Sequence, residues 1–146
     1  SSDLLNDEMG EQLRTTGSEF GATTGRPRRC GWIDLVALKM ACMVNGVTQI
    51  IMTKTDILDA IAQLNVCGAY KINGKEVTEV PFQMNRMQIE PVYKSFAGWQ
   101  TDISLLKDYD GLPAKMKEYI NYINSYLNVP VKYISNGPGR DQIITA

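Results

Sequence analysis

The dipeptide Asn73-Gly74, set between two short segments rich in β-forming residues, constrains the fold of this chain more than any other feature. A two-residue hairpin turn needs positive φ at both central positions, which Asn and Gly adopt at low cost. Residues 66–72 and 75–80 are therefore expected to pair as a β-hairpin.

Two other segments carry apolar residues at helical spacing. Residues 34–44 begin at Asp34, a favoured N-cap, and stop at Asn45-Gly46, so we expect a buried helix. Residues 113–127 have Pro near the start and one apolar face, which predicts an amphipathic helix. Its expected buried residues are Met116, Tyr119, Ile120, Ile123 and Leu127.

The remaining segments alternate with these helices. Short apolar runs predict an interior strand at 49–53 and further strands at 92–96 and 131–134, while residues 56–64 predict a short helix. Residues 1–31, rich in Gly, Thr and charge, predict an irregular loop. The expected fold class is α/β: part of a mixed, mostly parallel sheet with flanking helices and an inserted β-hairpin.

Composition excludes several kinds of function. With a net charge of −1, the chain has no general attraction for nucleic acid, and no apolar run is long enough to span a membrane. Three widely spaced cysteines fit neither a disulfide framework nor a zinc site, which favours a cytoplasmic setting. The sequence contains no histidine and so lacks the commonest general base. It starts at Ser1 without Met, so we expect either a piece cut from a longer protein or a processed chain.

Residues 21–29, here called the arginine loop, gather three guanidinium groups with two threonines and two glycines. Arg binds carboxylate or phosphate through a planar fork, and Gly lets the backbone approach the ligand. The loop therefore predicts an anion site. Two alternatives are a merely solvated basic loop and, from Gly25-Arg26-Pro27, a hook for the DNA minor groove, which the balanced charge disfavours.

Residues 53–56, here called the guanine segment, follow an expected strand, where α/β proteins often bind ligands. Asp56 could accept hydrogen bonds from N1–H and the 2-amino group of guanine, while the stem of Lys54 covers the base. Adenine would leave the carboxylate unpaired. The alternative is a strand end followed by an N-capped helix.

Residues 135–140, here called the C-terminal turn, contain Asn, Gly and Pro after the last expected strand. Such clusters are ordinarily turns. The backbone N–H groups could also bind a base carbonyl, with Pro138 covering the ring.

These three segments occur in an order that resembles the adenylosuccinate synthetase family. Residues 17–34 resemble its long signature around the aspartate-binding loop, and residues 53–59 resemble its guanine-specificity segment. Pro91-Val92-Tyr93, Gly98-Trp99, Gly111-Leu112-Pro113 and residues 135–140 follow in the family's order. The similarity covers essentially the whole chain.

The resemblance implies a GTP-dependent ligase that joins IMP and L-aspartate in purine nucleotide synthesis. It implies that residues 1–31 form an aspartate/IMP loop region and residues 32–146 a guanine-binding α/β region. The implied substrate-binding residues are Ala22, Thr23, Thr24, Gly25, Arg26, Pro27 and Arg28, with Arg26 also on IMP. The implied GTP-binding residues are Arg28, Lys54, Thr55, Asp56, Ser135, Asn136, Gly137 and Pro138.

The resemblance also implies that this is the C-terminal portion of the enzyme, inactive alone. The family's phosphate loop, catalytic residues and Mg²⁺ ligands would lie in an N-terminal part outside the chain. The intact enzyme would be a cytoplasmic homodimer without nucleic-acid or membrane partners. One rival interpretation is a free-standing GTP-sensing module, which needs its own G-x-x-x-x-G-K-[ST] loop; the sequence has none. Another is a nucleic-acid binder that uses the arginine loop, which predicts salt-dependent binding.

Overall fold

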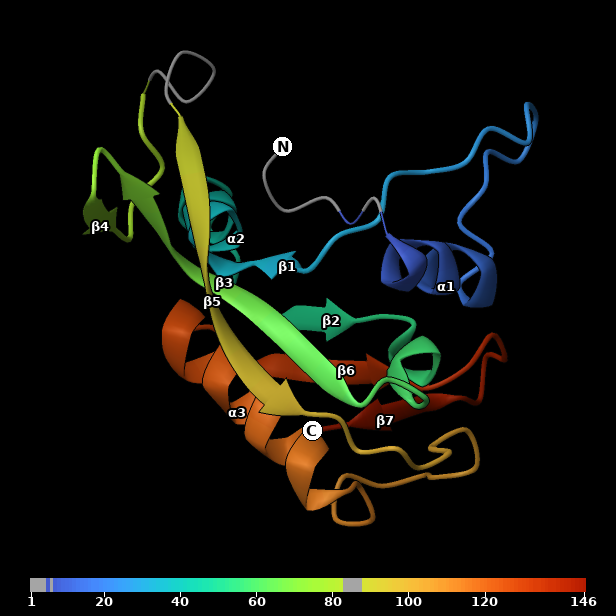
Figure 1. Cartoon of the computed structure of the whole chain (residues 1–146). Helices are drawn as coiled ribbons and strands as arrows, with labels where there is room; N and C mark the ends of the chain where they lie inside the picture. The colour runs from blue at the N-terminus through green and yellow to red at the C-terminus, as the bar shows by residue number, and fades with distance from the viewer. Residues whose placement is uncertain (1–4, 6, 83–87) are drawn as a thin grey trace.

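The hairpin expected at Asn73-Gly74 is present in the computed structural model, which describes Leu5 and residues 7–82 and 88–146. Asn73 and Gly74 have φ of 50° and 80°, and Ile72 pairs with Lys75 across the turn. Residues 1–4 and residue 6 of the loop expected at 1–31 lie outside the described part. Figure 1 shows the elements in space. In chain order they are α1 (Glu8–Thr16), β1 (Ile33–Asp34), α2 (Leu35–Val44), β2 (Ile50–Met52), the 3₁₀ helix η1 (Thr55–Leu58), β3 (Gln63–Ile72), β4 (Lys75–Val77), β5 (Ile89–Ala97), α3 (Ala114–Leu127), β6 (Val131–Ser135) and β7 (Ile143–Thr145).

The described strands form two sheets in a mixed α/β fold, which confirms the expected class. One sheet has the order β1-β3-β4, with β5 also paired to β3, and the other has the order β2-β6-β7. The pairs β1/β3 and β2/β6 are parallel, whereas β3/β4, β3/β5 and β6/β7 are antiparallel. Three of these five pairs are antiparallel, because short returns such as residues 136–142 cannot provide the crossover that a parallel pair needs. The predominance of parallel pairing expected for the larger sheet stays a prediction.

Both expected helices are present. In α3 all five predicted residues are buried: Met116, Tyr119, Ile120, Ile123 and Leu127. In α2 the Asp34 carboxylate accepts a hydrogen bond from the Ala37 N–H at 3.0 Å, as expected for the N-cap. However, Met43 and Val44 are 73% and 74% exposed, so the expected buried helix is buried on one face only. Its inner face contacts β3 and α3.

Several expectations are wrong for identifiable reasons. Part of the region predicted as irregular loop forms α1. The Asp7 carboxylate caps this helix by accepting a hydrogen bond from the Gly10 N–H, and Leu13 anchors the helix in the core. The helix expected at 56–64 ends after a single 3₁₀ turn. β2, expected to be interior, pairs with β6 on one side only among the described strands, and Ile51 is 61% exposed. No element was predicted at β7.

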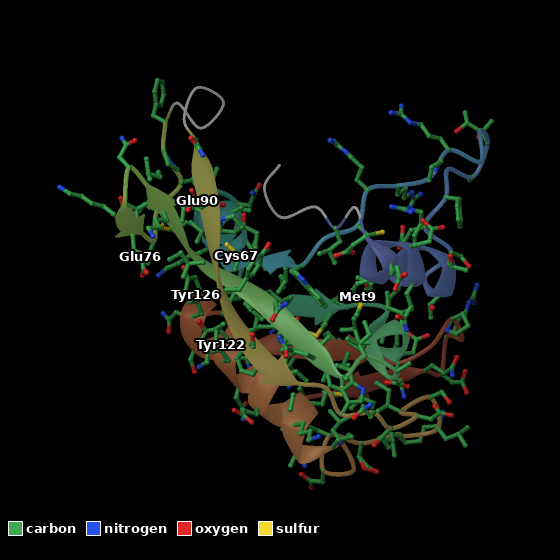
Figure 2. The ribbon with its side chains drawn as sticks, in the orientation of Figure 1. Met9, Cys67, Glu76, Glu90, Tyr122 and Tyr126 are labelled. Atoms are coloured by element: carbon green, nitrogen blue, oxygen red, sulfur yellow. The ribbon has the colours of Figure 1, made fainter. Side chains whose placement is uncertain are left out.

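The core lies where α3 packs against both sheets. It combines Leu64 and Val66 of β3 and Phe96 of β5 with the buried face of α3 and with Ile134 of β6. The Phe96 and Tyr119 rings meet edge to face with centroids 5.6 Å apart. Figure 2 labels Tyr122 and Tyr126 of α3; the Tyr126 hydroxyl donates to the Gly68 carbonyl at 2.7 Å. One core therefore fixes the two sheets relative to each other.

Candidate functional site

Parallel pairing of β2 and β6 brings the guanine segment and the C-terminal turn together. Both strands run in the same direction (Figure 1), so the loops that follow them leave the same edge of the sheet. The Thr55 hydroxyl donates to the Ser135 carbonyl at 2.8 Å, and Thr55 is 1% exposed. Two segments 80 residues apart thereby form adjoining walls of one site.

Lys54 has an unusual backbone at the start of η1. Its φ of 57° lies in the left-handed region, which costs a non-glycine residue roughly 1–2 kcal/mol. Its ammonium donates to the Gly17 carbonyl at 2.7 Å and pairs with the Glu19 carboxylate. The lysine stem therefore runs from the end of β2 to the turn after α1, with its charge bound at the far end.

The arginine loop is a small ribbon closed by its own backbone. Phe20 and Pro27 form an isolated antiparallel bridge, and the Gly21 N–H donates to the Arg26 carbonyl at 2.8 Å. At the tip, the Gly25 N–H donates to the Gly21 carbonyl at 2.8 Å, with Gly25 at φ +64°, a conformation that suits glycine. Residues 22–29 are exposed. A cavity of about 440 Å³ is lined by Gly21, Thr24, Arg26, Pro27, Arg28 and Arg29.

Glu19 links the arginine loop to the guanine segment. One carboxylate oxygen pairs with the Arg28 guanidinium at 3.0 Å, and the other pairs with the Lys54 ammonium. The hydrogen bond from Lys54, followed by that from Arg28, holds the pKa of Glu19 below its usual value. Sequence reasoning gave Glu19 no role, although it lies inside the run that resembles the family signature. Its partners Arg28 and Lys54 are 9 and 35 residues away, so no local pattern reveals the link.

A second cavity lies between the arginine loop and η1. Its volume is about 390 Å³, and Glu19, Arg28 and Arg29 contribute polar groups beside Ile57 and Leu58 of η1. The rest of its lining is largely apolar and includes Leu13, Trp32, Ile33, Leu64 and Tyr119. The base of the arginine loop and η1, the helix that contains Asp56, therefore face a common space.

Asp59, next to the guanine segment, holds the loop that follows β5. One carboxylate oxygen accepts from the Trp99 indole at 2.6 Å, and the other accepts from the Ile103 N–H at 3.0 Å. Burial raises the pKa of Asp59 above its ordinary value, against the lowering effect of these two hydrogen bonds. Asp56, three positions earlier, is half-buried. The two neighbouring carboxylates thus have different surroundings.

Within the C-terminal turn the structure directs Asn136 inward. Its side chain is fully buried, and its amide donates to the carbonyls of Ile103 at 2.6 Å and Leu106 at 3.0 Å. The backbone N–H of Asn136 donates to the Gln142 carbonyl at 3.1 Å. Asn136 therefore braces the turn from inside. Gly137 and Pro138 lie toward the surface.

Two further observations concern other kinds of site. Among the residues that the structure describes, no three Cys, Asp or Glu side chains are grouped so that they could hold a metal ion. In the same ranges no helix is long and apolar enough to cross a membrane.

The fold and these loops define the class: an α/β protein whose candidate ligand site includes the loops that follow the parallel strands β2 and β6. Within that class the chain belongs to the adenylosuccinate synthetase family, because the family model described as adenylosuccinate synthetase matches residues 2–144. The chain is 50% identical over 141 residues to the adenylosuccinate synthetase of Christiangramia forsetii and 45% identical over 138 residues to that of Scheffersomyces stipitis.

These alignments cover 97% and 94% of this chain but 33% and 32% of the two relatives. The chain thus spans about one third of the length of the curated relatives it matches. A solved structure of fully ligated adenylosuccinate synthetase from Plasmodium falciparum superposes with a TM-score of 0.93 at 36% identity. That superposition covers all of this chain and 36% of the Plasmodium protein.

Proposed function

We propose that this chain carries the aspartate-binding loop and the guanine-recognition segment of a GTP-dependent ligase that joins IMP and L-aspartate to give adenylosuccinate. The observation that carries the proposal is the convergence of the three segments. Glu19 joins the arginine loop to the guanine segment, and Thr55 joins the guanine segment to the C-terminal turn. Membership of the family supplies the reaction that such a site would serve.

In this proposal the guanine segment and the C-terminal turn bind GTP. The Asp56 carboxylate accepts hydrogen bonds from guanine N1–H and from the 2-amino group, and the stem of Lys54 lies along the base. Thr55 ties this wall to Ser135. Gly137, Pro138 and the backbone of Asn136 form the adjoining wall, which the buried Asn136 side chain braces from inside. Adenine has an acceptor at N1 and no 2-amino group, so it would leave the carboxylate unpaired.

The arginine loop would bind the other two substrates. Thr24 and Arg28 hold the carboxylates of aspartate, and Arg26 reaches both the ribose of IMP and the aspartate. Arg28 also comes near the GTP, which agrees with its place beside the carboxylate that holds Lys54. Ala22, Thr23, Gly25 and Pro27 shape the loop around the ligand. On this proposal residues 1–31 are the aspartate/IMP region and residues 32–146 the guanine-binding region.

The chemistry requires positioning and charge stabilisation more than a nucleophile in this chain. GTP would phosphorylate O6 of IMP, and the aspartate amine would then displace that phosphate. Fixed guanidinium and ammonium groups stabilise charge on transferring phosphoryl groups. In this proposal, as the family resemblance implies, the Mg²⁺ ligands and the catalytic residues lie in a part of the enzyme outside this chain. The complete enzyme would be a cytoplasmic homodimer.

The test is an adenylosuccinate synthesis assay on the full-length parent protein with IMP, aspartate, Mg²⁺ and either GTP or ATP. Product with GTP and little with ATP is the expected result. Product with ATP at the same rate would contradict the guanine-reading role of residues 53–56. If well-folded parent protein yields no product with either nucleotide, the ligase proposal is wrong.

A further inference from the structure

The carboxylate of Glu19 lies between a cation from each of the two ligand segments. Its oxygens bind the Arg28 guanidinium at 3.0 Å and the Lys54 ammonium, and its side chain is 22% exposed. In the proposed site Arg28 belongs to the aspartate loop and Lys54 to the guanine segment. Glu19 is therefore a physical link between the places where two different substrates would bind.

The backbone of Glu19 is fixed on both sides, so its carboxylate has a defined position. The Glu19 N–H donates to the Arg14 carbonyl at 2.8 Å at the end of α1. The Glu19 carbonyl accepts from the Arg28 N–H at 2.9 Å, which also anchors the arginine loop. Glu19 and Arg28 are thus joined by one main-chain hydrogen bond and one side-chain ion pair. A shift of Arg28 therefore moves the Glu19 carboxylate, which Lys54 binds.

Charge makes this arrangement depend on the carboxylate. The Arg28 guanidinium and the Lys54 ammonium bind one group, and two cations so placed repel each other when no anion separates them. At neutral pH a glutamate carboxyl group is ionised, and the hydrogen bonds from Lys54 and Arg28 lower the pKa of Glu19 further, so the anion stays between the two cations. A neutral residue at this position would let the two cations move apart, and the two segments would lose their fixed relation.

We propose that Glu19 is a positioning residue that couples the two halves of the site, so that aspartate with IMP and the guanine nucleotide each favour binding of the other. This inference rests on the proposed function. Ligands on the arginine loop fix Arg28, Arg28 fixes the carboxylate, and the carboxylate fixes the stem of Lys54 against the base. The coupling is reciprocal, as equilibrium linkage requires.

The test measures GDP binding to the full-length parent enzyme by calorimetry, with and without saturating IMP and L-aspartate. For the wild type we expect GDP to bind at least about fivefold more tightly with both ligands present, at the lower end of typical coupling between sites. In Glu19→Gln the ratio of the two dissociation constants should fall to about one. A residue with a merely structural role would change both constants alike and leave their ratio unchanged.

Two further variants complete the design. Glu118→Gln neutralises an exposed carboxylate on α3, outside the three segments of the site, and should keep the wild-type ratio. Glu19→Asp keeps the charge on a side chain one methylene shorter, so the ratio should lie between those of Glu19→Gln and the wild type. It also supplies the comparison if Glu19→Gln fails to fold. An unchanged ratio in Glu19→Asp would then contradict the proposal.

The outcomes separate this inference from the function on which it rests. Parent enzyme that makes adenylosuccinate from GTP but shows a ratio of one, or keeps its ratio in Glu19→Gln, would overturn the coupling role alone. Parent enzyme that binds no GDP and makes no product would overturn the proposed function. If the ratio of the two dissociation constants falls to about one in Glu19→Gln while GDP still binds, the result supports both the coupling role and the proposed function.

Discussion

Asp56 is the residue on which the proposed choice of nucleotide depends. It follows Thr55, whose hydroxyl is bound to Ser135, so its backbone position is set by the packing of two strands. A carboxylate at this point can accept two hydrogen bonds from guanine, whereas an amide presents a donor to one of guanine's donors.

We therefore expect Asp56→Asn in the full-length enzyme to raise KM for GTP by about 10- to 100-fold, because the substitution removes hydrogen bonds to a charged group. KM for aspartate should change little. Steady-state kinetics with GTP and with ATP would also reveal a weaker preference for GTP. Equal losses with every substrate would argue against a role in reading the base.

Arg26 supports the complementary experiment. It is exposed and lines the cavity of the arginine loop, away from the guanine segment. Arg26→Leu should raise KM for aspartate and for IMP by about tenfold or more, since it removes a charge-assisted contact. The ratio of rates with GTP and ATP should stay at its wild-type value. A changed nucleotide preference in Arg26→Leu would contradict the separate assignment of the two loops.

The ion pairs of Glu19 also predict a pH dependence. Because its pKa in the folded protein is lowered, the carboxylate stabilises the fold above its ordinary pKa near 4.5. That contribution disappears as the pH falls through the lowered value. The free energy of unfolding of the parent protein should therefore exceed that of Glu19→Gln at pH 7, and the difference should vanish in strong acid. Denaturant unfolding at both pH values measures it; a difference that grows toward acid would refute the assignment.

At the scale of elements, the end of β5 packs directly on the chain before β3. The Gly98 N–H donates to the Ala62 carbonyl at 2.8 Å, and a Cβ placed on Gly98 would lie 1.7 Å from the Ile61 carbonyl oxygen. Because the obstacle is backbone, it cannot rotate away as a flexible side chain would. This close approach explains why glycine precedes Trp99 here.

We expect Gly98→Ala to lower the free energy of unfolding of the parent protein by about 3 kcal/mol, at the upper end for an overpacked site. Gly111→Ala is the matched control, since its added Cβ would meet its nearest atom, the Asp108 carbonyl oxygen, at 3.6 Å. It should change stability by less than about 1 kcal/mol. Similar effects of the two substitutions, measured by chemical denaturation, would show that the contact at Gly98 is relaxed in solution.

The elements that could be predicted from the sequence are those with a strong local signal. The turn at Asn73-Gly74, the N-cap of α2 and the buried face of α3 follow from neighbouring residues and were confirmed. α1 was not predicted because its few apolar residues lie in a polar, threonine-rich stretch. The helix predicted at 56–64 ends before Asp59, whose carboxylate binds Trp99 and Ile103, 40 and 44 residues away, and no local pattern reveals these contacts.

The same division holds for the site. Its three loops could be found from residue type and from resemblance to the family, whereas the contacts that join them could not. The joining contacts span 30 to 80 residues of sequence. Glu19 binds Lys54, Thr55 binds Ser135, and Asn136 binds Ile103 and Leu106. Such contacts depend on which strands pair, and the one-sided burial of α2 depends equally on tertiary neighbours.

At the scale of the whole molecule, these 146 residues contain the proposed ligand-reading loops but neither a histidine nor a grouped metal site among the described residues. If residues 1–146 are produced alone, we expect at most weak binding of guanine nucleotide and no turnover. Product analysis after incubation with IMP, aspartate, Mg²⁺ and GTP tests this. Adenylosuccinate formed by this polypeptide at a rate above the protein-free blank would contradict the proposed division of labour.

The bond between Thr55 and Ser135 has a consequence for how the protein is made. Ribosomes add about 5–20 residues per second, so the 80 residues that separate these partners take roughly 4–16 s to synthesise. Throughout that interval β2 lacks β6, its partner in the sheet, so the backbone N–H and C=O groups that would pair with β6 have no strand to bind. The nucleotide pocket that we propose is therefore completed only after residue 135 has left the exit tunnel, and until then the nascent chain holds one wall of it.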